Sequence, residues 1–355
     1  MTHRFQYDAV DRTLRDLLKN DMPFGGVTML LSGDFRQTLP VIPRAGPAET
    51  AIDDQTAEQV QAFADYLLRI GDGRHGTSPD LDRNFVEIPR DMLLGGGQHH
   101  EGADHGMDGQ VVRSSRLSRL IETVYADFNE EHQPDNYFAE RIILTPKNAD
   151  VLAINDMILD KLPGDAQEYR SVDTLDGDDE LERQERSDLY PPEFLNTISL
   201  SGMPPHKLRL KIGTPVMLIR NINTKEGLCN GARLRVVSLR RNCMQAVIMG
   251  GAVAGKKVLI PRIALISKNS GFPFELRRKQ FPVQVAFAMT INESQSQSIQ
   301  ILGLYLPGPV FSHGQFYVAV SRVTARQNIT ILAENPATTE DGVYTKNIVY
   351  REIVI

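Results

Sequence analysis

The sequence predicts an α/β fold of two domains, the second of which carries an inserted β-rich segment. Short apolar runs alternate with amphipathic helical segments, as they do in proteins built on parallel sheets. Over residues 207–267 this alternation gives way to short apolar segments separated by turn residues, which is typical of a small barrel. The length of 355 residues also suits about two domains of roughly 150 residues each.

The first half has the elements of an α/β domain interrupted by a loop. Apolar residues at helical spacing predict helices over 8–20, 57–70 and 116–128, and the apolar run at 27–31 predicts a buried strand. Residues 71–110 are rich in glycine and histidine, which predicts a loop. The loop contains His99, His100 and His105, but adjacent histidines among glycines lack a rigid element that could fix a metal's coordination geometry. We therefore favour a surface loop over a metal site.

The second domain is predicted to begin near residue 140. A buried strand over 141–146 precedes a helix with Asn148 as its N-cap and with Val151, Ile154 and Ile158 facing inward. After the β-rich segment, strands are expected over 283–291, 301–306 and 329–332, and a helix over 313–323. The predicted domains are therefore residues 1–139 and 140–355, with the barrel at about 207–267.

Composition excludes several classes of protein. The two cysteines lack C-x-x-C spacing, which excludes a disulfide scaffold and a cysteine-based zinc cluster. No apolar stretch is long enough to span a membrane, and residues 1–12 lack the apolar core of a signal peptide. These features predict a soluble intracellular protein. The net charge of −6 provides no overall basic surface, so nucleic-acid binding must depend on local patches.

Charge is unevenly distributed along the second domain. Residues 165–193 hold eleven acidic and three basic residues, which predicts a solvated loop. Residues 207–241 hold nine basic residues and one acidic residue, and alternate them with apolar residues. This basic stretch, with Arg233 and Arg235 at its centre, is either an ordinary solvated strand face or a surface that contacts a phosphate backbone.

A first polar loop, Ser32–Gln37, directly follows the predicted strand at 27–31. Ligands of open α/β sheets bind at the carboxyl ends of strands, where this loop would lie. Asp34 could join a metal or water network next to Gly33, and Gln37 could sense a phosphate and its attacking water. A simple Gly-Asp turn would explain the same residues.

Two further segments could carry chemistry. Between two apolar strands lies a run of hydroxyl and amide side chains, which could hold a phosphate backbone through neutral hydrogen bonds. The residues of this run are Thr290, Asn292, Ser294, Gln295 and Gln297. Arg322 falls near the end of the predicted helix over 313–323, where an arginine could reach a neighbouring phosphate. A polar connecting loop and a charge at a helix C-terminus are the alternatives.

Taken together and in order, these segments resemble a known family. The segments LLSGDFRQTLPVIPR, LTPKNADVLAIN, GLCNGARL, VAFAMTINESQSQS and YLPGPVFSHGQFYVAVSRV are similar to those of the petite-integration-frequency (PIF) helicases. So are FLNTISLSGMPPHKLRLKIGTPVMLIRNI and YTKNIVY. The resemblance covers most of the chain and is greatest to the branch found in Helitron transposons.

The resemblance implies a superfamily-one, 5′→3′ ATP-dependent DNA helicase with a P-loop NTPase-like fold of two RecA-like domains. ATP and Mg²⁺ would be its cofactors, and single-stranded and forked DNA its partners, in DNA repair, recombination or transposition in the nucleus or mitochondrion. Gln37 would then be the γ-phosphate sensor and Arg322 the arginine finger. Residues 290–298 would touch the DNA backbone, and the barrel would border the DNA channel.

The sequence departs from the family pattern at several points. It contains no G-x-x-x-x-G-K-[ST] loop, and Met1–Arg4 resembles the segment after the family's acidic pair, so we expect an N-terminally truncated chain that hydrolyses ATP negligibly. An arginine-bearing motif expected between Arg44 and Gln61 is absent. Glu293 and Ser296 replace the family's lysine and glycine, and a carboxylate near a DNA phosphate would repel it. A non-catalytic DNA-binding remnant and a non-functional fragment are the alternative functions.

Overall fold

A computed structural model describes residues 4–27, 57–75, 78–97, 109–128, 133, 136–176, 189–200, 202–267, 271–295 and 297–353. The chain forms two compact units. Unit 1 comprises residues 1–124, 143–148 and 289–355, and unit 2 comprises residues 125–142 and 149–288. This division differs from the predicted boundary near residue 140, because helices of the first 124 residues pack on strands from the end of the chain.

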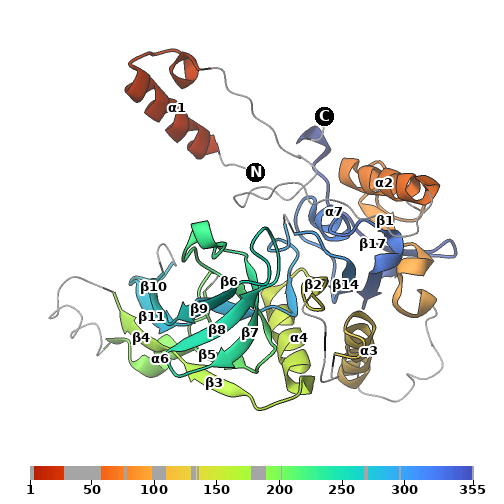
Figure 1. Cartoon of the computed structure of the whole chain (residues 1–355). Coiled ribbons are helices and arrows are strands. Elements are labelled where there is room, and N and C mark those ends of the chain that lie inside the picture. Colours follow the sequence, from red (N-terminus) through yellow and green to blue (C-terminus); the bar gives the residue numbers. More distant parts are fainter. Residues whose placement is uncertain are drawn as a thin grey trace. The chain divides into compact units, whose positions relative to one another are not determined.

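The main sheet of unit 1 has four strands in the order β13-β2-β14-β15. Their bounds are Ala288–Thr290, Arg141–Thr145, Ile301–Leu306 and Ile329–Ala333. β14 and β15 are parallel, as predicted for an α/β domain, and α3 (Gly109–Val124) packs against both (Figure 1). A side chain at Gly303 of β14 would come within 2.7 Å of Val124, so a glycine permits this close approach of α3.

A second, small sheet of unit 1 corrects the prediction for residues 71–110. That stretch contains β1 (Phe85–Glu87) and two 3₁₀ turns, Arg90–Met92 and Leu94–Gly97. β1 pairs in antiparallel fashion with β17 (Val343–Lys346), which also pairs with β16 (Ala337–Thr338). The sequence could not indicate β1, because its partner lies more than 250 residues away along the chain.

Besides α3, three further predicted helices of unit 1 are present. They are α1 (Arg4–Leu18), α2 (Ala57–Asp72) and α7 (Gln315–Val320), of which α7 is shorter than predicted and packs against α2. A short 3₁₀ turn, Pro23–Gly26, follows α1, and the Asp11 carboxylate accepts a hydrogen bond from its Phe24 amide. Within the described residues, no helix combines the length and the hydropathy needed to cross a membrane.

Unit 2 is mainly β-structure. Its five-stranded sheet has the order β12 (Val283–Val285), β6 (Pro215–Leu218), β7 (Arg233–Leu239), β8 (Cys243–Ile248) and β9 (Lys257–Pro261). A three-stranded sheet consists of β10 (Ile263–Ile266), β11 (Leu276–Gln280) and β4 (Val172–Leu175), and a two-stranded one of β3 (Gln167–Arg170) and β5 (Lys207–Leu210). Two helices, α4 (Asn148–Lys161) and α6 (Pro192–Thr197), complete the unit, and Val151, Ile154 and Ile158 of α4 are buried as predicted.

The β-structure of unit 2 is larger than the predicted insertion over 207–267. β3 and β4 come before that range, and β11 and β12 come after it, yet Tyr169 and Phe281 share one core with the five-stranded sheet. The predicted strand over 283–291 is accordingly two strands, β12 and β13. Apolar periodicity alone could not show where one strand ended and the next began.

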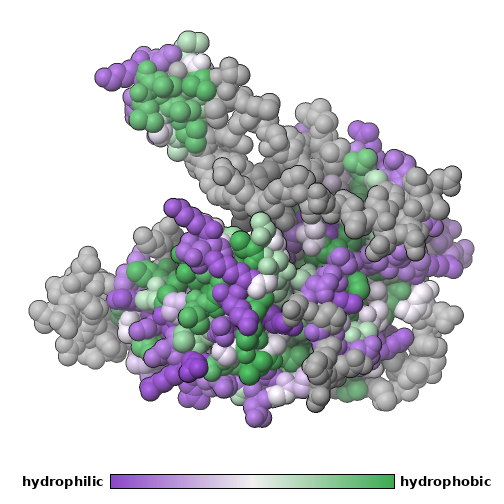
Figure 2. Space-filling model, in the orientation of Figure 1, coloured by the Kyte–Doolittle hydropathy of each residue, from purple (hydrophilic) through white to green (hydrophobic). Residues whose placement is uncertain are grey.

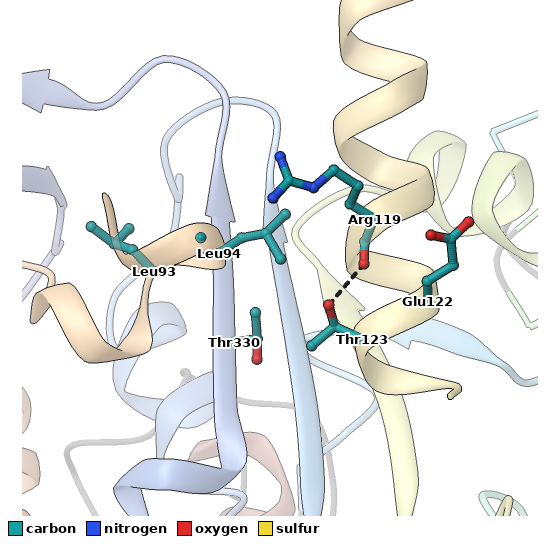
Figure 3. A pocket seen from close by; sticks show the side chains of 7 residues that line it. Leu93, Leu94, Arg119, Glu122, Thr123 and Thr330 are labelled. Carbon is teal, nitrogen blue, oxygen red and sulfur yellow. Dashed lines mark hydrogen bonds between the residues drawn. The ribbon is translucent and has the colours of Figure 1, made fainter. Parts of the chain in front are cut away.

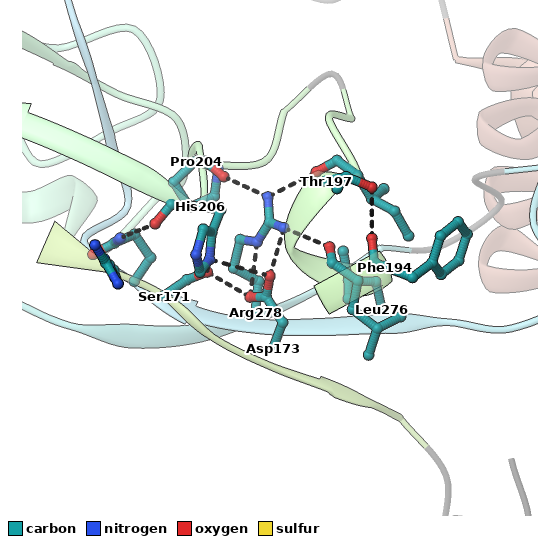
Figure 4. Close-up of polar contacts among 12 residues, drawn as sticks. Ser171, Asp173, Phe194, Thr197, Pro204, His206, Leu276 and Arg278 are labelled. Atoms are coloured by element: carbon teal, nitrogen blue, oxygen red, sulfur yellow. Dashed lines mark hydrogen bonds and ion pairs between the residues drawn. The ribbon is translucent and has the colours of Figure 1, made fainter. Parts of the chain in front are cut away.

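The acidic stretch over 165–193 is in part a buried structural segment. Asp173, on β4, accepts two hydrogen bonds from the Arg278 guanidinium at 2.9 and 2.6 Å, and both side chains are almost fully buried (Figure 4). Arg278 also donates to the carbonyls of Leu195, Ile198 and Pro204. The predicted solvated loop is therefore wrong for β3 and β4, while residues 177–188 lie outside the described residues.

Candidate functional site

The polar segment after β13 begins with a capping box. The Thr290 amide donates to Glu293 Oε2 at 3.0 Å, and the Glu293 amide donates to Thr290 Oγ1 at 3.3 Å. On sequence alone we expect the Glu293 carboxylate to lie near a DNA phosphate. In the structure this carboxylate accepts a hydrogen bond from the backbone of its own loop. The T-x-x-E spacing that produces this turn is visible in the sequence and could have been recognised there.

The interior of this loop is used for folding. Ser294 is fully buried and its hydroxyl donates to the Ile291 carbonyl at 2.7 Å, so this side chain is not placed for the predicted contact with DNA. Thr290 is buried as well, at 8% exposure. Asn292, Gln295 and Gln297 are partly exposed.

The end of β13 lies beside the end of β2, because the Ile291 amide donates to the Thr145 carbonyl at 3.0 Å. Two buried polar atoms here, Asn292 Oδ1 and Thr145 Oγ1, have no hydrogen-bond partner within the described part of the chain. Buried polar atoms are rarely left unpaired, so this edge of the sheet has unused capacity to bind a polar ligand or water.

Arg322 lies two residues beyond α7 and is joined to the same loop. Its guanidinium donates to Val318 O at 2.8 Å, to Gln297 O at 3.4 Å and to Ser321 Oγ at 3.0 Å. Its own carbonyl accepts a hydrogen bond from the Ile299 amide at 2.9 Å. The fold thus brings together two segments that the sequence singled out separately.

Several predicted site residues fall outside the described residues. These are Gly33, Asp34 and Gln37, together with His99, His100, His105 and Ser296. Among the residues that are described, no group of three or more His, Cys, Asp or Glu side chains could hold a metal ion.

Arg233 has a different role from the one predicted. Its guanidinium donates to the carbonyls of Phe138, Ala139, Arg141 and Ala286, at 2.7 to 3.3 Å, all within unit 2. Burial lowers its pKa below the ordinary value for arginine. This guanidinium already donates to four main-chain carbonyls and so has few donors left for a phosphate. In the structure Arg233 therefore makes structural contacts where a DNA contact was expected.

The other basic residues of 207–241 do not form one surface. Arg209 pairs with Asp160 on α4, and the Lys211 ammonium donates to the Asp160 and Leu162 carbonyls at the end of that helix. Arg235 of β7 is half-buried, whereas Arg240 and Arg241 are exposed in the turn before β8. The face of unit 2 visible in Figure 2 accordingly mixes hydrophilic and hydrophobic residues. Arg209 and Lys211 at one end of this stretch contact α4, and Arg233 at its centre contacts main-chain carbonyls, so these three cations serve the fold.

Unit 1 also has a surface pocket of about 410 Å³ beside α3, shown in Figure 3. It is lined by Leu93, Leu94 and Gly95 of a 3₁₀ turn, by Arg119, Glu122 and Thr123 of α3, and by Thr330 of β15. Its Thr123 hydroxyl donates to the Arg119 carbonyl of its own helix at 2.8 Å. None of the site residues predicted from sequence lines this pocket.

Two family models match the chain. The model "PIF1-like helicase" matches residues 1–52, and "DNA helicase Pif1, 2B domain" matches residues 193–239, which lie in unit 2. Curated relatives match over nearly the whole chain. The human ATP-dependent DNA helicase PIF1 is 25% identical over 334 residues, which cover 93% of this chain and 44% of the relative. The chain thus spans less than half the length of that relative.

A bacterial relative and two solved structures complete the comparison. The ATP-dependent DNA helicase Pif1 of a Psychrobacter species is 23% identical, covering 94% of this chain and 52% of the relative. The Candida albicans Pif1 helicase superposes with a TM-score of 0.55 at 20% identity, over 100% of this chain and 73% of that one. A Bacteroides Pif1 helicase in complex with ADP-AlF3 and ssDNA superposes with a TM-score of 0.53 at 21% identity, over 92% of this chain and 67% of that one. The chain is therefore similar to the Pif1-like helicases over nearly its whole length and shares their fold.

Proposed function

We propose that this chain binds single-stranded DNA and serves in ATP-dependent 5′→3′ unwinding of DNA. The observation that carries the proposal is the hydrogen bond from the Arg322 guanidinium to the Gln297 carbonyl. It joins a cation suited to phosphate with a loop of hydroxyl and amide side chains, within one unit. The relatives that match the chain are named as ATP-dependent DNA helicases, which supports the same proposal.

In this proposal the surface-exposed members of the loop hold the DNA backbone. Asn292, Gln295 and Gln297 would donate their side-chain amides to phosphate or sugar oxygens, which positions a strand without reading its sequence. Arg322 would stabilise negative charge on the terminal phosphate of ATP, and Gln37 would orient the attacking water. Asp34 and Gly33 would contribute to the network around the nucleotide and its Mg²⁺.

The nucleotide would supply a phosphoryl group whose hydrolysis drives movement along the strand. What this chain contributes is electrostatic: a guanidinium held by Val318, Gln297 and Ser321 in one orientation and therefore already ordered. Because Arg322 and residues 297–299 are joined by hydrogen bonds, a shift of the arginine toward a phosphate would also change the conformation of the loop. This is how nucleotide and DNA binding would be linked.

Binding of a fluorescently labelled oligothymidylate, followed by anisotropy across a salt series, tests the proposal. We expect binding that weakens linearly with the logarithm of salt concentration. Gln297→Ala should weaken it by about 0.5–1.5 kcal/mol, as expected for one neutral hydrogen bond. Gln327→Ala, an exposed glutamine on another turn, is the matched control. A folded chain without salt-dependent binding would overturn the proposal.

Strand displacement from a forked duplex tests the catalytic part. Unwinding that requires ATP and a 5′ single-stranded tail would support 5′→3′ movement, and a requirement for a 3′ tail would contradict it. Oligonucleotide binding without ATP hydrolysis would restrict the function to that of a DNA-binding module.

A further inference from the structure

A second pocket of unit 1, of about 240 Å³, lies at the ends of two parallel strands. Leu306 and Ala333, the last residues of β14 and β15, line it together with Pro309 and Pro336 from the loops that follow. The carboxyl ends of parallel strands are where α/β sheets bind ligands. None of the site residues predicted from sequence lines this pocket.

Two aromatic rings give the pocket a flat lining. Phe85 of β1 and Tyr344 of β17 both line it. In the antiparallel register Phe85 lies opposite Lys346 and Tyr344 opposite Glu87, so the two residues lie on the same face of the sheet as diagonal neighbours. Ala337 of β16 lies opposite Tyr344 on that face, and its small side chain leaves the space open.

Thr345 also lines the pocket, and two exposed polar side chains stand at its rim. Lys346 is exposed, and an ammonium there can bind a phosphate as a point charge. The exposed Asn335 donates one amide hydrogen to the Pro307 carbonyl at 3.3 Å, which ties the two lining loops together. The amide of Asn335 has a donor and an acceptor, as the edge of a nucleobase does.

Size and chemistry together select the ligand. The volume lies below the roughly 300–1,000 Å³ of pockets that hold drug-sized molecules, so one ring system fits better than a whole nucleotide. Flat apolar walls favour a planar ring, and a cationic rim favours a phosphate next to it. Both features occur together in a strand of DNA, whose bases stack on aromatic side chains.

We propose that this pocket takes one nucleobase of a bound single strand, with Lys346 against the neighbouring phosphate. The inference rests on the proposed function, because it names a subsite for the same DNA. It adds a base-dependent contact to the backbone contacts of residues 290–298, on strands of the same sheet.

An abasic-site scan tests the pocket. The affinity of the full chain is measured for an oligothymidylate and for versions in which one internal nucleotide at a time lacks its base. We expect one position of the strand at which loss of the base weakens binding by about tenfold, while abasic sites elsewhere have little effect. Uniform affinity across the whole scan would overturn the pocket but leave the proposed function intact. Absence of binding to any oligonucleotide would instead overturn the proposed function.

A pocket-filling variant gives an independent test. Ala337→Leu should reduce affinity for the intact strand by about tenfold and abolish the difference between intact and abasic strands. Thr338→Leu, which changes the neighbouring exposed residue of β16, is the matched control and should bind as the parent does. Circular dichroism establishes that both variants are folded. Normal discrimination by a folded Ala337→Leu variant would contradict the proposal, as would a pocket that binds apolar peptides in preference to the oligonucleotide.

Discussion

Arg322 is joined to Gln297 through its side chain and to the nearby Ile299 through its main chain. The Arg322 guanidinium donates to the Gln297 carbonyl at 3.4 Å, and two residues further along the Ile299 amide donates to the Arg322 carbonyl at 2.9 Å. A charged side chain therefore helps to hold the shape of a loop that is distant in sequence. Its replacement should affect the loop even without any ligand.

Arg322→Ala should lower the free energy of unfolding by about 1–2 kcal/mol, because the carbonyls of Val318 and Gln297 lose a charged donor. Amide hydrogen exchange of residues 297–299 should become faster in the same variant. Arg326→Ala is the control, because Arg326 pairs with Asp91 at the surface and such pairs contribute little. Equal effects of the two substitutions would contradict a specific role of Arg322 in this loop.

Arg233→Met should destabilise the protein by about 2–4 kcal/mol, since it leaves four main-chain carbonyls without their donor. Urea unfolding measures the loss. Arg241→Met, in the exposed turn before β8, should change stability by less than about 0.5 kcal/mol. If Arg233→Met weakened DNA binding with no loss of stability, Arg233 would be a phosphate contact after all.

Asp173→Asn should cost about 3–5 kcal/mol, because it leaves the buried Arg278 guanidinium without its counter-charge. Glu168→Gln removes an acidic residue from the same stretch of sequence, but its partner Arg170 is largely exposed, so the loss of stability should be much smaller than that of Asp173→Asn. The double variant Asp173→Leu/Arg278→Met should be more stable than Asp173→Asn. Thermal unfolding of the four proteins distinguishes a buried structural pair from a solvated acidic loop.

Glu334 should make stability depend on pH in the direction opposite to that of most acids. Burial raises the pKa of its carboxyl group above the ordinary value, and Arg116 at 3.9 Å opposes this shift. The folded protein therefore holds the proton more tightly than the unfolded chain does. Stability should fall as pH rises from the ordinary pKa of glutamate through the raised pKa in the folded state.

The Glu334→Gln variant should lack this decrease in stability with rising pH, and it should be more stable than the parent protein at neutral pH. Unfolding by urea at a series of pH values is the measurement, with Glu340→Gln in an exposed turn as the control. A parent protein whose stability rises through the same interval, with no change on Glu334→Gln, would show that Arg116 outweighs burial.

Much of the fold could be predicted from local pattern. The spacing of apolar residues placed α2, α4, β2, β14 and β15 because each buries one face or both faces against a neighbour. Pairing between distant segments could not be predicted in this way. β1 has three residues and is a strand only because it pairs with β17. β4 can bury the carboxylate of Asp173 because Arg278 lies opposite it on β11.

The candidate site was predicted as separate parts. Sequence indicated the polar run over 290–298 and Arg322, and the structure adds that they are hydrogen-bonded to each other. It could not tell Ser294, which is buried, from Gln295, which is partly exposed, because both are polar residues of one loop. Nor could it tell Arg233 from Arg235, since the carbonyls that hold Arg233 come from two other segments of the chain, residues 138–141 and residue 286.

The order of strands in the main sheet of unit 1 has a consequence for biosynthesis. β2 ends at Thr145, but its neighbours β13 and β14 begin only at Ala288 and Ile301, after almost all of unit 2. On the ribosome β2 must therefore wait for its partners while more than a hundred residues are translated. Most strands of unit 2 are translated in that interval, but its last strands, β11 and β12, end only at Gln280 and Val285. A nascent chain whose residues up to Phe287 have left the ribosome would thus hold every described strand of unit 2 and an incomplete main sheet in unit 1.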